Sequence, residues 1–266
     1  MTRNKVGIII LYLLVFALVA CTSSVQKNEI GGKGAIIKKV EYHQNDSLSK
    51  YLSADINVFL IEGDSPFSDS VNALILSAYM PRGESIPEDV SKLFDVYYQS
   101  QAQEVKELIE DFEETQLLPY SFKYDAVVFE NTDSVFSFEK SFYQYTGGAH
   151  GNRGKRFWNF DASTGAQLRL EDLFSKKELA ELAELGELSF RKNRKIPKNK
   201  SLKELGYEFD DGFSLTSNFL ITDTGLVFYY APYAIAPYAF GDTEFTISLI
   251  SIKNIAPKSE LFRYVK

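Results

Sequence analysis

A glycine-rich loop between two aromatic-rich segments constrains the fold more than any other part of the sequence. The loop, TGGAHGNRG at residues 146–154, holds four glycines and His150, one of only two histidines in the chain. Residues 135–145 before it and 155–160 after it are rich in phenylalanine, tyrosine and tryptophan, a composition typical of strands. Glycine adopts positive φ without a Cβ clash, so such a loop can turn tightly. The pattern predicts two strands joined by a compact loop.

The N-terminus has the pattern of a bacterial lipoprotein signal peptide. Arg3 and Lys5 precede an apolar run at residues 6–19, which is shorter than the roughly 20 residues of a membrane span, and the run ends in Leu-Val-Ala-Cys at 18–21. We expect a signal peptide at 1–20, a lipid on Cys21 that attaches the protein to the membrane, and a flexible tether over 21–34. The alternative is an uncleaved anchor helix. Thr22 follows the cysteine in place of aspartate, which favours the outer membrane of the cell envelope where the host has one.

Cysteine usage and charge exclude several function classes. Cys21 is the only cysteine, so once lipidated it leaves no thiol for a disulfide, a nucleophile or a metal site. The chain has 36 acidic and 29 basic residues, and its net charge of −7 disfavours nucleic acid as a partner. No metal-ligand spacing is present, and we expect neither a metal nor a cofactor.

Apolar periodicity and turn residues predict an α+β protein whose sheet is mainly antiparallel. One long helix is expected in the N-terminal half, from a capping box at Ser85 to just before Pro119, and a second helix follows Ser175 to about residue 191. A shorter helix is expected at 66–79. Two portions follow from these elements, an N-terminal α+β portion at 35–150 and a C-terminal β-rich portion at 151–266. The predicted strands are 35–42, 50–61, 120–131, 133–145, 155–160, 167–170, 217–222, 226–230 and 244–249.

An ordered series of motifs resembles a known family. The series is YTGGAHG at 145–151, FDASTG at 160–165, LEDLF at 170–174, GLVFYY at 225–230 and PYAIAPYAFG at 232–241. Together these resemble the exported bacterial proteins called domain of unknown function 3298, and residues 35–150 resemble its companion, domain of unknown function 4163. Relatives include the extracellular part of a lysozyme-sensing anti-sigma factor and a segment attached to a peptidoglycan deacetylase. The resemblance implies an envelope setting and recognition of a lysozyme-like protein or of a peptidoglycan-type glycan.

The candidate ligand-binding residues lie in the glycine loop, in the strand after it and in the tyrosine-rich segment near residue 235. Tyrosine offers a flat apolar face and a polar tip to a ligand. For His150 the alternative role is to hydrogen-bond its own loop backbone, and for the tyrosines it is to cover the core. The predicted set is His150, Tyr145, Gly147, Gly148, Trp158, Tyr233 and Tyr238.

Catalysis is the second hypothesis. A hydrolase acting on envelope polymer would use His150 with Asp161 or Ser141, since a hydroxyl or carboxylate close to the imidazole is the minimum for acid–base or nucleophilic chemistry. The sequence has no Gly-x-Ser-x-Gly elbow. We therefore expect a non-enzymatic, lipid-anchored recognition module ahead of an enzyme.

Overall fold

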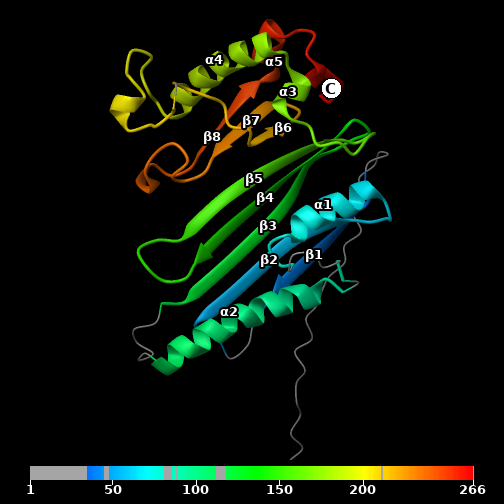
Figure 1. Cartoon of the computed structure of the whole chain (residues 1–266), viewed down its shortest axis with the longest axis vertical. Coiled ribbons are helices and arrows are strands. Elements are labelled where there is room, and N and C mark those ends of the chain that lie inside the picture. The colour runs from blue at the N-terminus through cyan, green and yellow to red at the C-terminus, as the bar shows by residue number, and fades with distance from the viewer. Residues whose placement is uncertain are drawn as a thin grey trace, which may run out of the picture.

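The computed structural model describes residues 35–44, 48–80, 86–87, 89–111, 118–210 and 212–265. The predicted signal peptide, the lipidation site Cys21 and the tether lie outside these residues. Within them the chain forms a five-stranded sheet with two helices on one face, followed by a three-stranded sheet with its own helices (Figure 1). This arrangement confirms the α+β class.

The five-stranded sheet has its strands in chain order, and antiparallel pairs dominate it. The β2–β3 pair is parallel, and the other three pairs are antiparallel. The parallel pair requires a long connection, and the two helices of the N-terminal half supply it. The strands are β1 (Ile37–His43), β2 (Leu52–Ile61), β3 (Tyr120–Asn131), β4 (Val135–Tyr145) and β5 (Asn152–Asp161).

Helices α1 (Pro66–Leu76) and α2 (Ser91–Asp111) cover one face of this sheet (Figure 1). Ser65 caps α1 by accepting a hydrogen bond from the Ser68 backbone, with Pro66 at the first helical position. Asn72 then fixes α1 to the end of β2 by bonding both the N–H and the C=O of Ile61, at 2.8 and 2.9 Å. In α2 the residues at three- and four-residue steps are buried, namely Phe94, Tyr98, Ala102 and Val105.

Side chains on β4 and β5 alternate between two separate cores. Phe136, Phe138, Trp158 and Phe160 lie in the core beneath α1 and α2. The intervening residues point the other way, where Phe157 contacts Leu220 and Tyr229 of the second sheet. Even-numbered residues of the two strands therefore share the helix-covered face, and odd-numbered residues share the opposite face.

The second sheet contains β6 (Phe219–Ile221), β7 (Gly225–Tyr230) and β8 (Thr243–Ser248), all antiparallel. Helix α4 (Lys176–Asn193), capped by Ser175, packs its buried Phe190 against Tyr230 and Phe245 of this sheet. The remaining elements are α3 (Leu170–Leu173), η2 (Lys203–Leu205), η3 (Tyr238–Phe240), α5 (Leu249–Ile255) and η4 (Glu260–Arg263).

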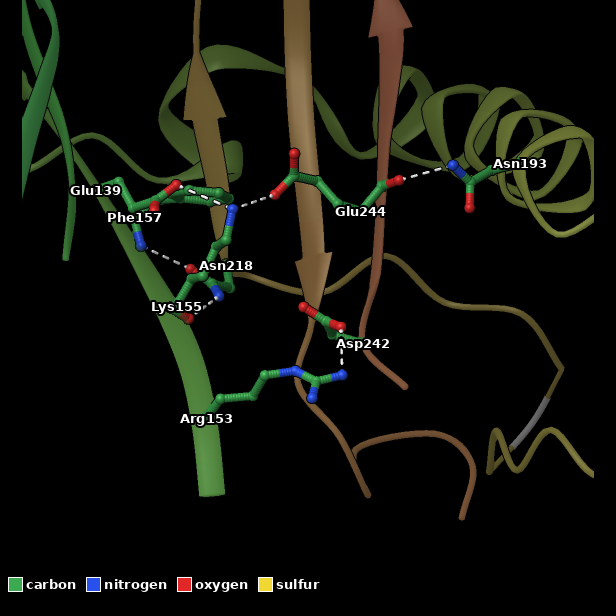
Figure 2. Close-up of polar contacts among 8 residues, drawn as sticks. All are labelled: Glu139, Arg153, Lys155, Phe157, Asn193, Asn218, Asp242 and Glu244. Carbon is green, nitrogen blue, oxygen red and sulfur yellow. Dashed lines mark hydrogen bonds and ion pairs between the residues drawn. The ribbon is translucent and has the colours of Figure 1, made fainter. Parts of the chain in front are cut away.

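Two asparagines join the sheets at the outer edge of β5. Asn218 accepts from the Phe157 N–H at 2.8 Å and donates to the Lys155 carbonyl at 2.9 Å (Figure 2). Asn159 donates to the Phe219 carbonyl and accepts from the Ile221 N–H, both at 2.8 Å. Strand β5 pairs with β4, so the five-stranded sheet extends beyond residue 150, where the sequence-based boundary between the two portions was placed.

Three element predictions need correction. The long helix begins at Ser91, six residues after the predicted Ser85, and the Asp89 carboxylate accepts from the Ser91 N–H at its start. Residues 167–170 form one bridge, Phe160 to Gln167, before Leu170 begins α3. The last strand stops at Ser248, which caps the unpredicted helix α5. No helix in the described part of the chain is long and apolar enough to span a membrane.

Candidate functional site

The glycine loop is a compact turn beyond the ends of β4 and β5. Gly147 and Gly148 have φ of 86° and 92°, conformations that a residue with a side chain rarely adopts. The Tyr145 hydroxyl donates to the Gly148 carbonyl at 2.9 Å and closes the loop. Three of the predicted site residues, Tyr145, Gly147 and Gly148, therefore shape the loop that presents His150.

His150 stacks directly on Tyr238, which lies 88 positions later in the chain. The ring centroids are 3.7 Å apart and the rings are nearly parallel, at 12°. The Tyr238 hydroxyl donates to the Gly151 carbonyl at 2.7 Å, and His150 Nδ1 lies 3.1 Å from the same oxygen. The structure thus brings the glycine loop and the tyrosine-rich segment together, a proximity that the sequence could not show.

Tyr233 extends this aromatic pair outward. Its ring centroid lies 5.5 Å from that of Tyr238, and 66% of the residue is exposed. Tyr233 has a positive φ of 68°, which is uncommon for a residue with a side chain. We call His150, Tyr233 and Tyr238 the aromatic tip.

Ion pairs hold the segment that follows Tyr238, at residues 242–244, against β5. Arg153 Nη2 lies 3.2 Å from Asp242 Oδ1, and Lys155 Nζ lies 3.0 Å from Glu244 Oε2 (Figure 2). The hydrogen bond to Asp242 raises the pKa of Arg153. Burial alone would raise the pKa of Asp242, but hydrogen bonds from its own backbone N–H and from Arg153 outweigh that effect and lower it. Both groups are thus charged at neutral pH, and the tip is anchored electrostatically.

An open groove of about 760 Å³ lies mainly on the helix-covered face of β4 and β5, and its lining includes Ala231 and Pro232, which directly precede Tyr233 of the aromatic tip. One wall is the C-terminal end of α1 with Leu74, Ser77 and Ala78, and the other is the Ala231–Pro232 segment that leads to Tyr233. Gly154 belongs to the floor, where a Cβ would stand 2.9 Å from the Phe142 ring. The other lining residues are Tyr124, Lys140, Ser141, Phe142, Asn152, Arg153, Lys155, Arg156, Trp158 and Gln167.

Four basic residues line the groove, and two of them, Lys140 and Arg156, belong to its helix-covered face. Lys140 Nζ donates to the Leu74 carbonyl at 3.2 Å and to Ser77 Oγ at 3.4 Å. Burial lowers the pKa of Lys140 to about 8. The Arg156 guanidinium lies over the Trp158 ring, 5.7 Å from its centroid. Sequence reasoning missed both residues. A signal was available, because each is a basic residue within one of the two aromatic-rich segments that flank the glycine loop.

Trp158 and Ser141 also line the groove, whereas Asp161 lies elsewhere. Trp158 is mostly buried and stacks on Phe138 with centroids 5.0 Å apart, so only part of its indole meets the groove. Ser141 faces Lys155 in the middle of the β4–β5 pair, and no hydrogen bond links it to His150 among the described contacts.

Asp161 stabilises a turn at the opposite end of β5, roughly 30 Å along the strand from the loop. Its carboxylate accepts from the N–H groups of Ser163 and Thr164 at 2.9 Å and from the Tyr264 hydroxyl at 2.9 Å. Burial raises the pKa of Asp161, but these hydrogen bonds prevail and lower it to about 2. The structure therefore does not bring His150 and Asp161 together. In the part of the chain that the structure describes, no group of three or more His, Cys, Asp or Glu side chains could hold a metal ion.

Comparison with known proteins identifies two regions. Residues 171–249 match the family model described as "Protein of unknown function (DUF3298)", and residues 44–153 match the one described as "Deacetylase PdaC". The DUF3298 part of the resemblance is confirmed. The relation to domain of unknown function 4163 and to the anti-sigma factor stays a prediction.

Two crystal structures of DUF3298 family proteins share the fold. One, from Bacteroides fragilis, has a TM-score of 0.65 and 19% identity, and the match covers 90% of this chain and 95% of that chain. The other, from Pseudomonas aeruginosa, has a TM-score of 0.57 and 20% identity, and covers 83% of this chain and 93% of that chain. At these identities the likeness establishes the fold alone. No curated protein matches the chain.

Proposed function

We propose that this chain, which carries a DUF3298 domain in its C-terminal half, is a lipid-anchored recognition module of the bacterial cell envelope that binds a cell-wall glycan. The observation that carries the proposal is that the groove wall at Ala231–Pro232 continues directly into Tyr233, so that an exposed aromatic ring follows one wall of an open groove with apolar and polar lining residues. Sugar rings pack against aromatic faces through their apolar C–H surface while their hydroxyls reach polar side chains.

The polar side chains around the groove fit such a ligand. Asn152 and Gln167 contribute amides, which can each donate and accept hydrogen bonds, and the Ser77 hydroxyl, whose proton is donated to the Leu74 carbonyl, can accept one. The openness of the groove fits a polymer that lies across the surface, rather than a small molecule enclosed in a cavity.

Binding is favoured over hydrolysis because the catalytic groups do not meet. An acid–base mechanism needs a carboxylate or hydroxyl within hydrogen-bond reach of the imidazole. Asp161 is occupied at the far end of β5, and His150 Nδ1 lies beside its own loop backbone. Residues 44–153 match the family model described as "Deacetylase PdaC", and the resemblance to a segment attached to a peptidoglycan deacetylase favours an envelope polymer as the ligand class.

Co-sedimentation of the full chain, purified in detergent, with isolated cell-wall sacculi tests the proposal. We expect the protein to pellet with the sacculi and Tyr233→Ala to weaken this binding several-fold. Phe129→Ala is the matched control, since Phe129 is an exposed aromatic residue, 48% accessible, on β3 outside the groove. Failure of the wild type to pellet, together with capture of a lysozyme-like protein in a parallel pull-down, would replace glycan recognition with protein recognition.

A further inference from the structure

Lys140 and Arg156 form a cationic pair that the fold itself does not neutralise. The two residues are directly opposite each other in the β4–β5 register and share the groove face. Like charges at opposite positions of neighbouring strands repel. Arg153 and Lys155, which also line the groove from β5, each have carboxylate partners, whereas neither Lys140 nor Arg156 forms an ion pair within the described ranges. This is unexpected in a chain with 36 acidic residues.

The surroundings of Lys140 position its ammonium group but supply no carboxylate among the described contacts. Its hydrogen-bond acceptors are a carbonyl near the end of α1 and a serine hydroxyl, and the Tyr79 ring lies 6.0 Å away. These groups are dipoles or apolar surface. The depressed pKa of about 8 agrees with a partly desolvated ammonium that lacks a counterion.

Arg156 is exposed and is oriented by Trp158. A guanidinium over an indole ring gains a cation–π interaction, and its N–H groups remain in the plane of the fork, available to an incoming acceptor. The groove therefore presents a half-buried ammonium and a preoriented guanidinium from adjacent strands, with aromatic floor residues beside them.

We propose that the groove recognises an acidic glycan, with a sugar carboxylate bound between Lys140 and Arg156. This inference rests on the proposed function and specifies the class of glycan. A carboxylate accepts the bidentate hydrogen bonds of a guanidinium and neutralises the adjacent ammonium, which removes the repulsion between the two side chains. The sugar ring carrying it lies over Phe142 and Gly154, between the α1 wall and the Ala231–Pro232 wall. The carboxylate belongs either to a lactyl ether on an amino sugar or to a uronic acid.

Calorimetric titration of the full chain in detergent with three tetrasaccharides tests this inference. The probes are neutral tetra-N-acetylglucosamine, an alternating N-acetylglucosamine–N-acetylmuramic acid tetramer with free lactyl carboxylates, and tetragalacturonate. We expect at least one acidic probe to bind about tenfold or more tightly than the neutral probe, since a charge-assisted hydrogen bond contributes that much. The tighter of the two acidic probes identifies the source of the carboxylate.

Variants localise the preference. Arg156→Gln, at an exposed position that should not affect folding, and Lys140→Gln should each weaken binding of the acidic probe about fivefold or more and leave the neutral probe within twofold. Lys106→Gln is the matched control, because Lys106 is exposed on α2 and the substitution removes the same charge. Equal affinity for neutral and acidic probes, or an equal loss in Lys106→Gln, overturns acid recognition but leaves the proposed function standing. Absence of binding to all three probes and to sacculi overturns both.

Discussion

Asp161 and His150 show how residue type alone misleads about a role. The hydrolase hypothesis pairs them, because a carboxylate near an imidazole suits acid–base chemistry and the two residues lie 11 positions apart in the sequence. An extended strand between them separates the two side chains. The Asp161 carboxylate accepts hydrogen bonds from a backbone N–H of the following turn and from a tyrosine hydroxyl. His150, in contrast, meets Tyr238, a contact that depends on how the second sheet docks and has no local sequence signal.

Replacing Asp161 with asparagine should destabilise the fold by about 1–2 kcal/mol at pH 7, because charge-assisted hydrogen bonds become neutral ones. The folded pKa of about 2 lies below the unfolded value of about 3.9, so this stabilisation is complete above pH 4 and is lost as the pH falls toward 2. Urea unfolding of wild type and Asp161→Asn at pH 7, 4 and 2.5 measures the difference in unfolding free energy. This difference should become smaller as the pH is lowered. Asp133→Asn, at an exposed turn position, is the control. A difference independent of pH contradicts this account.

Removing the Tyr238 hydroxyl tests how the aromatic tip is held. Tyr238→Phe keeps the ring stacked on His150 but deletes the donor to the Gly151 carbonyl, which should cost about 0.5–1.5 kcal/mol. Thermal unfolding should show a lower Tm than wild type. Tyr233→Phe removes a hydroxyl from the exposed neighbour and should leave Tm unchanged; equal shifts in the two variants would mean that the Gly151 bond contributes nothing.

At the scale of elements, the sequence predicted best where the periodic signal was long. Residues 120–131 were predicted as a strand and form β3 with the same bounds, because aromatic and β-branched residues are dense throughout. Helix α5 was missed because Leu-Ile-Ser-Ile has strand composition, and the capping bond from Ser251 N–H to Ser248 decides for a helix. The asparagines that join the sheets belong to no periodic sequence pattern, so their role could be found only in the structure.

Asn159 should be the more critical of the two joining asparagines. It is buried, and Asn159→Ala leaves the Ile221 N–H and the Phe219 carbonyl without partners, which should cost about 2–4 kcal/mol in unfolding free energy. Asn218 is half-buried, so water can replace its bonds in Asn218→Ala and the cost should be smaller. Chemical denaturation of both variants ranks them, and the reverse order would contradict the assignment.

At the scale of the whole molecule, the proposed function requires attachment to a membrane through Cys21. Cys21→Ser should abolish incorporation of an alkyne-labelled fatty acid and move the protein from the membrane fraction to the soluble fraction, because one hydroxyl cannot accept the thioether-linked lipid. Fractionation with and without detergent measures this. Thr22→Ser, beside the expected lipidation site, is the control and should leave labelling intact. Retention of the Cys21→Ser variant in membranes would favour the uncleaved anchor helix.

The outer edge of β5 is covered by other parts of the same chain, and this affects how neighbouring molecules associate at high density. An edge strand with open peptide groups is a template for a second chain. Along β5 the outward groups from Lys155 to Asp161 are largely taken by Asn218, Leu168 and Ala166 of the same chain. With the proposed lipid anchor, copies of the chain would be confined to a membrane surface and would collide far more often than in free solution. Sealing this edge from within removes a nucleus for aggregation between neighbours, so high surface density need not lead to fibrous association.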